Sequence, residues 1–448
     1  MRRRGFMIGT GLALGGTLAA VRMRALTPTA AAEAPRIQER ALGLNTAWAA
    51  VKGEFALTPG LAHMAGFFLA SHPRSVRNAI DRYRRGLDDN PLEFVEQHVA
   101  EREAAVREAA AAYGGGSPDD YAMTDSTTMG LGLVYGGLKL APGQEILSTT
   151  HDHICTTLAC QHRADRSAAP FRRIALYEDP ATASADAIVS RTLAGIRPNT
   201  RVLALTWVHS GTGVKLPIRA IADRLAEVNA KRNEIDHVLV VVDGVHGFGI
   251  DDQQLPNLGC DFFVAGCHKW IFGPRGTGLI WGRRKGWAAV QPTIPSMDPM
   301  WRKAPPDQLP GAAYMTPGGF HSFEHRWALD AAFRFHLQLG KARVAARIHS
   351  LNQTIKSELA RMKRVKVVTP MVTALSAGIV CFSVDGMSPA EVVARLRKAN
   401  VIATVTPPFY EPAYVRLSAG MITVESAAQV FYRAMKDAPV ATDLDALW

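Results

Sequence analysis

The sequence is poor in cysteine, and its few cysteines are not spaced for pairing. Only five of the 448 residues are cysteines, an odd number, which argues against a secreted fold held together by a disulfide framework. Cys155 and Cys160, followed by His162, form the closest grouping, but both cysteines fall in one predicted helix and no second pair accompanies them. We therefore expect no metal site. Most of the thiols are expected to be small core side chains. The five positions are Cys155, Cys160, Cys260, Cys267 and Cys381.

The sequence also lacks internal repeats, low-complexity blocks and runs of Lys and Arg interleaved with aromatic residues. Its formal net charge of +11 is therefore interpreted as solubility plus attraction for an anionic substrate, and nucleic-acid binding is not expected. Hydrophobic residues make up 48% of the chain, enough for a large buried core in one or two domains.

No apolar run is long enough for a stable membrane anchor. The run from Met7 to Val21 has about 15 residues, fewer than a spanning helix needs. It follows Arg3-Arg4, which match the twin-arginine pattern, and small residues up to Ala34 suit a cleavage site. The sequence thus predicts a signal peptide at residues 1–34, the twin-arginine (Tat) export machinery as a partner, and a periplasmic location.

Beyond the predicted signal peptide, strands and helices alternate. We expect an N-terminal segment at residues 35–95, a large domain with a mainly parallel sheet at 96–330, and a smaller α+β domain at 331–448. The predicted helices are 74–84, 93–112, 218–232, 326–349, 389–400 and 424–434, and the predicted strands are 145–148, 201–206, 238–242, 365–368, 378–384 and 414–418.

Two neighbouring strands of the large domain end in chemically suggestive residues. The apolar run from Val238 ends in Asp243, and the run Phe262–Ala265 leads to Lys269 and then to a Gly/Pro loop at 273–278. A lysine can form a Schiff base with the aldehyde of pyridoxal 5′-phosphate (PLP), and a carboxylate can keep its pyridinium nitrogen protonated. The ordered set predicts a PLP site built on Lys269 and Asp243.

The same stretch resembles a known family. Asp243-Gly-Val-His246 and Cys267-His268-Lys269-Trp270, followed by Gly-Pro-Arg-Gly-Thr-Gly, are similar to the cofactor core of class V PLP-dependent aminotransferases, and especially to the isopenicillin N epimerase-like subgroup. The resemblance implies the α/β architecture called PLP-dependent transferase fold type I, a homodimer with sites at the interface, and a cofactor role for His246 and His268.

The resemblance also implies residues for the phosphate. Thr127 and Thr128 open an apolar helical run, where free N–H groups and the helix dipole favour a dianion. Many desulfurase-like members carry a phosphate-binding Ser or Thr three residues before the lysine, but this chain has Gly266 there. Thr316, in a loop that resembles one reaching across the dimer, would contact the partner's phosphate through its hydroxyl.

Other matches concern the cofactor ring and the substrate. His153 follows an acidic residue at a strand end and would stack on the pyridine ring, with His151 as the second choice. Ser210 stands where the family has an Asn near the ring hydroxyl O3′, a role that His246 could share. Arg416, in an Arg-x-Ser strand, would bind the substrate α-carboxylate with two parallel hydrogen bonds.

These features predict a periplasmic PLP enzyme that acts on the amino group of an amino acid or of an aminated peptide or siderophore, by transamination or deamination. With its export signal, the chain also resembles periplasmic enzymes of this family that tailor pyoverdine siderophores. The alternative is an amino-acid epimerase; a non-catalytic PLP-fold binding protein is disfavoured because Lys269 and Asp243 are both present. Cysteine desulfuration is not expected, since residues 398–415 contain no cysteine and Cys381 should face the core.

Overall fold

The computed structural model describes residues 47–302, 304–423 and 431–435, and a seven-stranded sheet lies at their centre. The strand order is β2-β8-β7-β6-β5-β3-β4, and β8 alone runs antiparallel to its neighbours. The strands are β2 (Tyr121–Thr124), β3 (Glu145–Thr149), β4 (Phe171–Ile174), β5 (Thr200–Thr206), β6 (Leu239–Asp243), β7 (Phe262–Gly266) and β8 (Gly278–Gly282). The sheet is mainly parallel, as the alternation of elements predicts.

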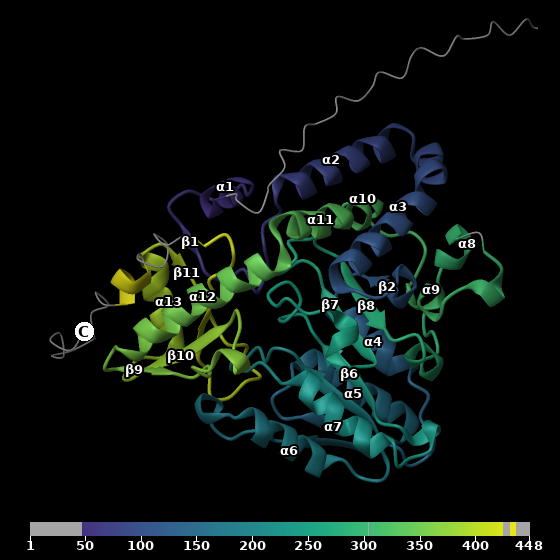
Figure 1. Ribbon diagram of the computed structural model, residues 1–448. Coiled ribbons are helices and arrows are strands. Elements are labelled where there is room, and N and C mark those ends of the chain that lie inside the picture. Colours follow the sequence, from purple (N-terminus) through teal and green to yellow (C-terminus); the bar gives the residue numbers. More distant parts are fainter. Residues whose placement is uncertain (1–46, 303, 424–430, 436–448) are drawn as a thin grey trace, which may run out of the picture. The chain divides into compact units, whose positions relative to one another are not determined.

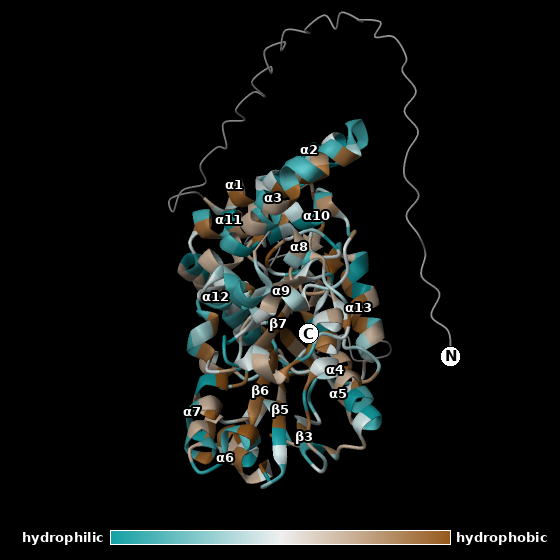
Figure 2. Cartoon of the chain, turned by 90° about the vertical axis from the view of Figure 1, so that its right-hand side faces the viewer, coloured by the Kyte–Doolittle hydropathy of each residue, from teal (hydrophilic) through white to brown (hydrophobic). Residues whose placement is uncertain are grey.

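Helices cover both faces of this sheet, because its central strands are buried from end to end. Figure 2 shows α6 (Ala185–Gly195) and α7 (Ile218–Asn229) on one side of the strands, and α4 (Thr127–Gly137) and α5 (Ile154–Ser167) on the other. Separate hydrophobic clusters fill the two sides, one with α7 and the other with α4 and α5. The parallel strands therefore end at one common edge, between these layers.

A second, antiparallel sheet of four strands follows in the sequence, with the order β12-β13-β10-β9. Its strands are β9 (Val365–Val367), β10 (Val380–Val384), β12 (Thr404–Val405) and β13 (Val415–Leu417). Figure 1 shows this sheet in yellow-green beside α12 (Lys341–Ala360) and α13 (Pro389–Lys398). A short parallel pair, β1 (Ala62–His63) with β11 (Val401–Ile402), joins the N-terminal segment to this part.

The N-terminal helices agree with the sequence patterns, but the helix predicted over residues 326–349 is wrong. In its place lie α10 (Phe323–Trp327), α11 (Leu329–Leu339) and α12, and Gly340 separates the last two with a φ of +82°. The spacing of apolar residues is helical on both sides of Gly340, so this pattern does not reveal that one glycine with a positive φ ends the first helix there. The remaining helices are α1 (Trp48–Gly53), α2 (Arg74–Asp89), α3 (Pro91–Gly114), α8 (Asp298–Arg302) and α9 (Gly311–Met315).

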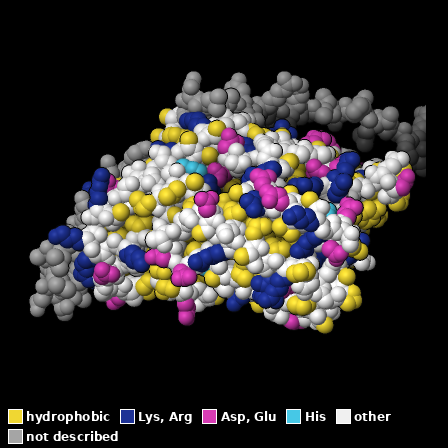
Figure 3. Space-filling view, turned by 60° about the horizontal axis from the view of Figure 1, so that its bottom comes forward, with side chains coloured by type: hydrophobic (Ala, Val, Ile, Leu, Met, Phe, Trp, Pro, Cys, Tyr) yellow, Lys and Arg dark blue, Asp and Glu magenta, His cyan; other side chains and the backbone are white. Residues whose placement is uncertain are grey.

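Two predictions fall wholly or partly outside the described residues: the signal peptide at 1–34, and the helix at 424–434, of which residues 431–435 are described and helical. The described residues belong to one compact unit, and the domain boundaries at 95 and 330 remain predictions. Among the described helices, none is long and apolar enough to cross a membrane. On the face drawn in Figure 3, basic and acidic side chains are interspersed.

Candidate active site

Asp243 and Lys269 meet at the carboxyl edge of the large sheet. β6 ends at Asp243, which is 1% exposed, and its parallel neighbour β7 ends three residues before Lys269. Asp243 accepts hydrogen bonds from the Thr156 hydroxyl and the backbone N–H of Val245, both at 3.3 Å. Parallel pairing of adjacent strands thus brings an acid and an amine, 26 positions apart, to one place.

The environment shifts both groups toward neutrality. Burial raises the pKa of Asp243 to about 6, while the Lys269 cation opposes that rise. Burial lowers the pKa of Lys269 to about 8, while the Asp243 carboxylate opposes that fall. At neutral pH Asp243 is therefore mostly ionised, and an appreciable fraction of the Lys269 amines is uncharged.

His246 supports the neutral form of this amine. Its Nε2 lies 3.4 Å from Lys269 Nζ, and its Nδ1 lies 3.4 Å from the indole Nε1 of Trp270. Burial, followed by the Lys269 cation, holds the pKa of His246 well below its usual value, so the ring is neutral. Because an indole N–H only donates, the proton of the neutral ring belongs on Nε2, where it points to the Lys269 nitrogen.

A cavity of about 100 Å³ opens above these groups. It combines side chains from the ends of β5, β6 and β7 with the first turns of α4 and α5. Its lining residues are Ser126, Thr127, Thr128, His153, Cys155, Thr206, Asp243, Val245, His246, His268 and Lys269. The structure therefore unites seven of the predicted site residues in one cavity.

One end of the cavity is the N-terminus of α4. Ser126 caps this helix by accepting from Met129 N at 3.1 Å, so Thr127 and Thr128 are its first two residues. The hydroxyl of Thr127 accepts from Gly266 N at 2.7 Å. A Cβ at position 266 would lie 3.1 Å from that hydroxyl and 2.8 Å from His268, so this close approach of strand and helix leaves no room for a larger residue than Gly266.

Of the two candidate histidines, only His153 lines the cavity. Its Nδ1 accepts from Cys155 N at 3.2 Å at the start of α5, and burial lowers its pKa to about 4. His151 stacks instead on Tyr177, with ring centroids 3.8 Å apart, and accepts from Leu176 N. A neutral, flat His153 ring is therefore the one placed to lie against a bound aromatic ring.

Comparison of the sequence with known proteins identifies the family of the chain. Residues 70–424 match the model of the family Aminotransferase class-V. The chain belongs to this family. It is 26% identical over 350 residues to isopenicillin N epimerase of Amycolatopsis lactamdurans, covering 75% of this chain and 84% of that protein. The epimerase of Streptomyces clavuligerus is 27% identical over 368 residues, covering 78% and 87%.

Solved structures of other enzymes have the same fold. The cystine C-S lyase C-DES superposes with a TM-score of 0.75 at 21% identity, over 86% of this chain and 99% of that one. A cysteine desulfurase from Thermococcus onnurineus NA1 gives a TM-score of 0.73 at 18% identity, over 87% and 97%. The predicted fold type I is confirmed by this likeness.

The cofactor of the class V family is PLP, and the cavity fits it chemically. Lys269 offers an amine for the aldehyde, Asp243 a buried carboxylate for the ring nitrogen, and His153 a flat neutral ring. The hydroxyls and free N–H groups at the start of α4 suit a dianionic phosphate. His268 also lines the cavity, and burial lowers its pKa to about 4.

Arg416 and Ser210 contact each other beside the cavity, and neither lines it. Arg416 donates through Nη1 to both the carbonyl and the hydroxyl of Ser210, and through Nε to the Thr404 hydroxyl at 3.3 Å. Ser210 thus helps to hold Arg416 in place, and its predicted role toward the cofactor ring hydroxyl stays a prediction.

Thr316 directly follows α9 and is 3% exposed. Its hydroxyl accepts from Met123 N at 3.1 Å, which leaves the hydroxyl hydrogen available for donation. Its contact with the phosphate of a partner subunit stays a prediction.

Four residues of the cavity wall were not predicted as site residues: Ser126, Cys155, Thr206 and Val245. Most cysteines were expected in the core, but Cys155 is partly exposed in the cavity, and its sulfur accepts from the Thr128 hydroxyl at 3.1 Å. Thr206 ends β5, and its backbone N–H donates to Asp152. Cys155 could have been predicted from its position, because it lies two residues after His153 in the first turn of α5.

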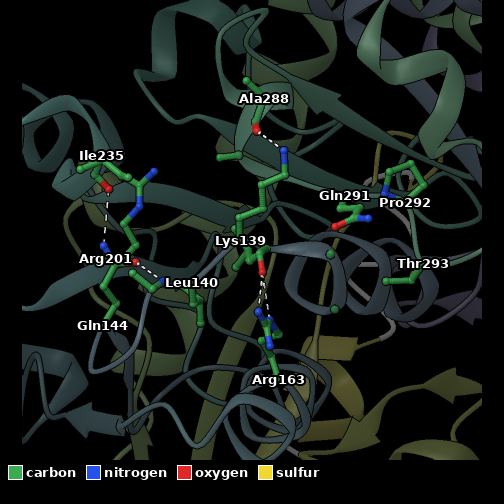
Figure 4. Close-up of a pocket in the computed structure, with 15 residues that line it drawn as sticks. Lys139, Leu140, Gln144, Arg163, Arg201, Ile235, Ala288, Gln291, Pro292 and Thr293 are labelled. Atoms are coloured by element: carbon green, nitrogen blue, oxygen red, sulfur yellow. Dashed lines mark hydrogen bonds between the residues drawn. The ribbon is translucent and has the colours of Figure 1, made fainter.

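A larger hollow of about 600 Å³ lies elsewhere and contains none of the predicted site residues. Its cationic side chains are occupied by backbone carbonyls: Lys139 donates to Ala288 O at 3.0 Å, and Arg163 donates twice to Leu138 O (Figure 4). These groups brace the ends of α4 and α5, and the smaller cavity around Lys269 remains the candidate active site.

Proposed function

We propose that the chain is an exported PLP enzyme that acts on the amino group of an amino acid or of an aminated peptide or siderophore-type substrate, by transamination or deamination. The observation that carries the proposal is the buried Lys269 amine, with its pKa lowered to about 8, beside an ionised Asp243. A lysine that acts as a nucleophile and proton acceptor must be neutral for part of the time, and a lowered pKa provides this neutral form at pH 7.

Bound PLP supplies an electron-poor ring that weakens the bonds to the substrate Cα. Asp243 keeps the ring nitrogen protonated, and His153 fixes the orientation of the ring. Lys269 would hold the cofactor through its amine, and the same amine in its neutral form would accept the proton from the substrate Cα. Arg416 orients the substrate through its carboxylate.

Epimerisation is the second candidate, and the similarity to two isopenicillin N epimerases over three quarters of the chain favours it. Transamination and epimerisation begin with removal of the same proton and differ in where a proton returns. Cysteine desulfuration is not proposed. Cys381 lies on β10 opposite Arg416 but is fully buried, and burial raises the pKa of its thiol to about 12.

The proposal includes a compartment and an assembly. The twin arginines and apolar run of residues 1–34 support export through the Tat route to the periplasm, a route that carries folded, cofactor-loaded proteins. The resemblance of the cofactor motifs to those of class V enzymes supports a homodimer. Export together with family membership supports a siderophore-tailoring role such as that of the pyoverdine enzymes.

A product assay tests the proposed function. The mature holoenzyme is incubated with single amino acids, with and without a 2-oxo acid, and the mixture is analysed for new 2-oxo acid, ammonia and the opposite enantiomer. Transfer to the 2-oxo acid or release of ammonia supports the leading candidate, and the opposite enantiomer supports epimerisation. Turnover that persists in a Lys269→Ala control refutes the proposed role of the lysine.

A further inference from the structure

The loop between β12 and β13 carries two aromatic residues next to the active site. The Thr406 N–H donates to Tyr414 O, and the Tyr414 N–H donates to the Thr406 hydroxyl, both at 2.9 Å, so the loop is closed at its base. β13 begins directly after it and carries Arg416. The loop is therefore anchored to the same strand as the proposed carboxylate-binding residue.

Phe409, on this loop, extends to the cavity wall. Its ring meets the His153 ring edge to face, with centroids 5.2 Å apart and an interplanar angle of 88°. His153 lines the cavity together with Lys269. Phe409 remains 43% exposed, although it is a large hydrophobic residue. Part of an apolar side chain thus remains exposed beside the active site.

Tyr410, the next residue of the loop, packs beside the contact between Arg416 and Ser210. Its ring packs on Gly211, where an added Cβ would lie 2.7 Å from ring atoms, and Gly211 directly follows the Ser210 that accepts from Arg416. Its hydroxyl is buried and has no hydrogen-bond partner among the described residues. A buried hydroxyl without a partner costs free energy, and at this position next to Arg416's partner Ser210 it is available to donate to a ligand.

The charge state of this hydroxyl suits donation. Burial raises the pKa of Tyr410 well above its usual value, and the nearby carboxylates of Asp152 and Asp243 add to the rise. The phenol therefore stays protonated throughout the neutral range. Arg416, through Nη1 and Nε, is already fixed by Ser210 and Thr404, which leaves its Nη2 group without a protein acceptor among the described residues.

We propose that the β12–β13 loop recognises the substrate: the Tyr410 hydroxyl donates to the carboxylate that Arg416 binds, and Phe409 contacts the substrate side chain. This inference rests on the proposed function, because it needs an amino-acid substrate with its nitrogen at Lys269. The favoured class is an α-amino acid with an aromatic or large apolar side chain.

Binding to the holoenzyme tests the hydroxyl. L-phenylalanine, L-alanine and phenethylamine are titrated separately while the visible absorption of the bound cofactor is followed. Tyr410→Phe keeps the ring on Gly211 and removes only the donor, and Tyr414→Phe on the same loop is the matched control. We expect affinity for the two amino acids to fall on the order of tenfold or more in Tyr410→Phe, as for a hydrogen bond to a charged group, and affinity for phenethylamine to stay unchanged.

Phe409→Ala tests the apolar contact. It should reduce the preference for L-phenylalanine over L-alanine while leaving the affinity for L-alanine near that of the unchanged protein. Equal affinities in Tyr410→Phe and the control, or an equal loss for phenethylamine and the amino acids, would overturn this inference alone. A holoenzyme whose spectrum responds to none of the three probes would overturn the proposed function and this inference with it.

Discussion

Replacing Asp243 by Asn should have opposite effects on cofactor loading and on turnover. The Asp243 carboxylate is what raises the pKa of Lys269 against the effect of burial and of the Arg416 cation. Without it the pKa of Lys269 falls below about 8, and more of the amine is neutral at pH 7. Turnover should fall by orders of magnitude, since the ring nitrogen loses the charge that keeps it protonated, at about 1.4 kcal/mol per tenfold.

The size of the loading effect follows from the pKa of Lys269. With a pKa of about 8, about 9% of the amines are neutral at pH 7 and about 90% at pH 9. Loading of PLP into the unchanged apoprotein should therefore be roughly tenfold slower at pH 7 than at pH 9. In Asp243→Asn this ratio should be smaller, because a larger fraction of the Lys269 amine is neutral at pH 7.

The assay is the initial rate of appearance of the visible band when free PLP is added to apoprotein at the two pH values. Taking the ratio within each protein cancels any loss of PLP affinity in the variant. Circular dichroism of both apoproteins serves as the folding control. An Asp243→Asn ratio that matches the roughly tenfold ratio of the unchanged protein would refute the electrostatic coupling argued here.

Four further outcomes are expected. Borohydride reduction of the holoenzyme followed by peptide mapping should label Lys269, and Lys269→Ala should lose the visible band; label on another lysine contradicts the site. Arg416→Lys should weaken binding of carboxylate-bearing substrates about tenfold or more while PLP binding persists, since a lysine ammonium cannot be held by Ser210 and Thr404 and reach the carboxylate as the planar guanidinium does; unchanged KM values would assign the carboxylate elsewhere. Replacing Arg3 and Arg4 by Lys should leave unprocessed protein in the cytoplasm, and processed periplasmic protein would reject the Tat route. Cys381→Ser should keep full activity, and steady alanine production from L-cysteine that depends on this thiol would place the chain in sulfur transfer.

The parts of the site that the sequence predicted best are those fixed by strand ends. Asp243 and Lys269 each follow an apolar run, and adjacent parallel strands bring such residues together without further information. The threonines at the start of α4 and the histidine at the start of α5 were predictable for the same reason, since helix starts in this layered fold lie at that edge.

The sequence did not predict contacts made across long stretches of chain. Ser210 accepts from Arg416, which lies 206 residues away. The hydroxyl of Thr316 accepts from Met123 N, 193 residues earlier. Phe409 and Tyr410 carry no local motif, and only the folded loop places them beside His153 and Gly211. Such pairings depend on tertiary packing, which a local pattern does not contain.

The two proposed anchors for an amino-acid substrate belong to different sheets: Lys269 follows β7 of the seven-stranded sheet, and Arg416 lies on β13 of the four-stranded one. Without substrate, the two sheets are joined near the site by the contacts of Arg416 with Ser210. A substrate whose nitrogen is held at one sheet and whose carboxylate is held at the other is a cross-link between them. Its binding free energy would then add to the cohesion of the whole chain, so saturation with substrate would raise the melting temperature and slow amide exchange in both sheets.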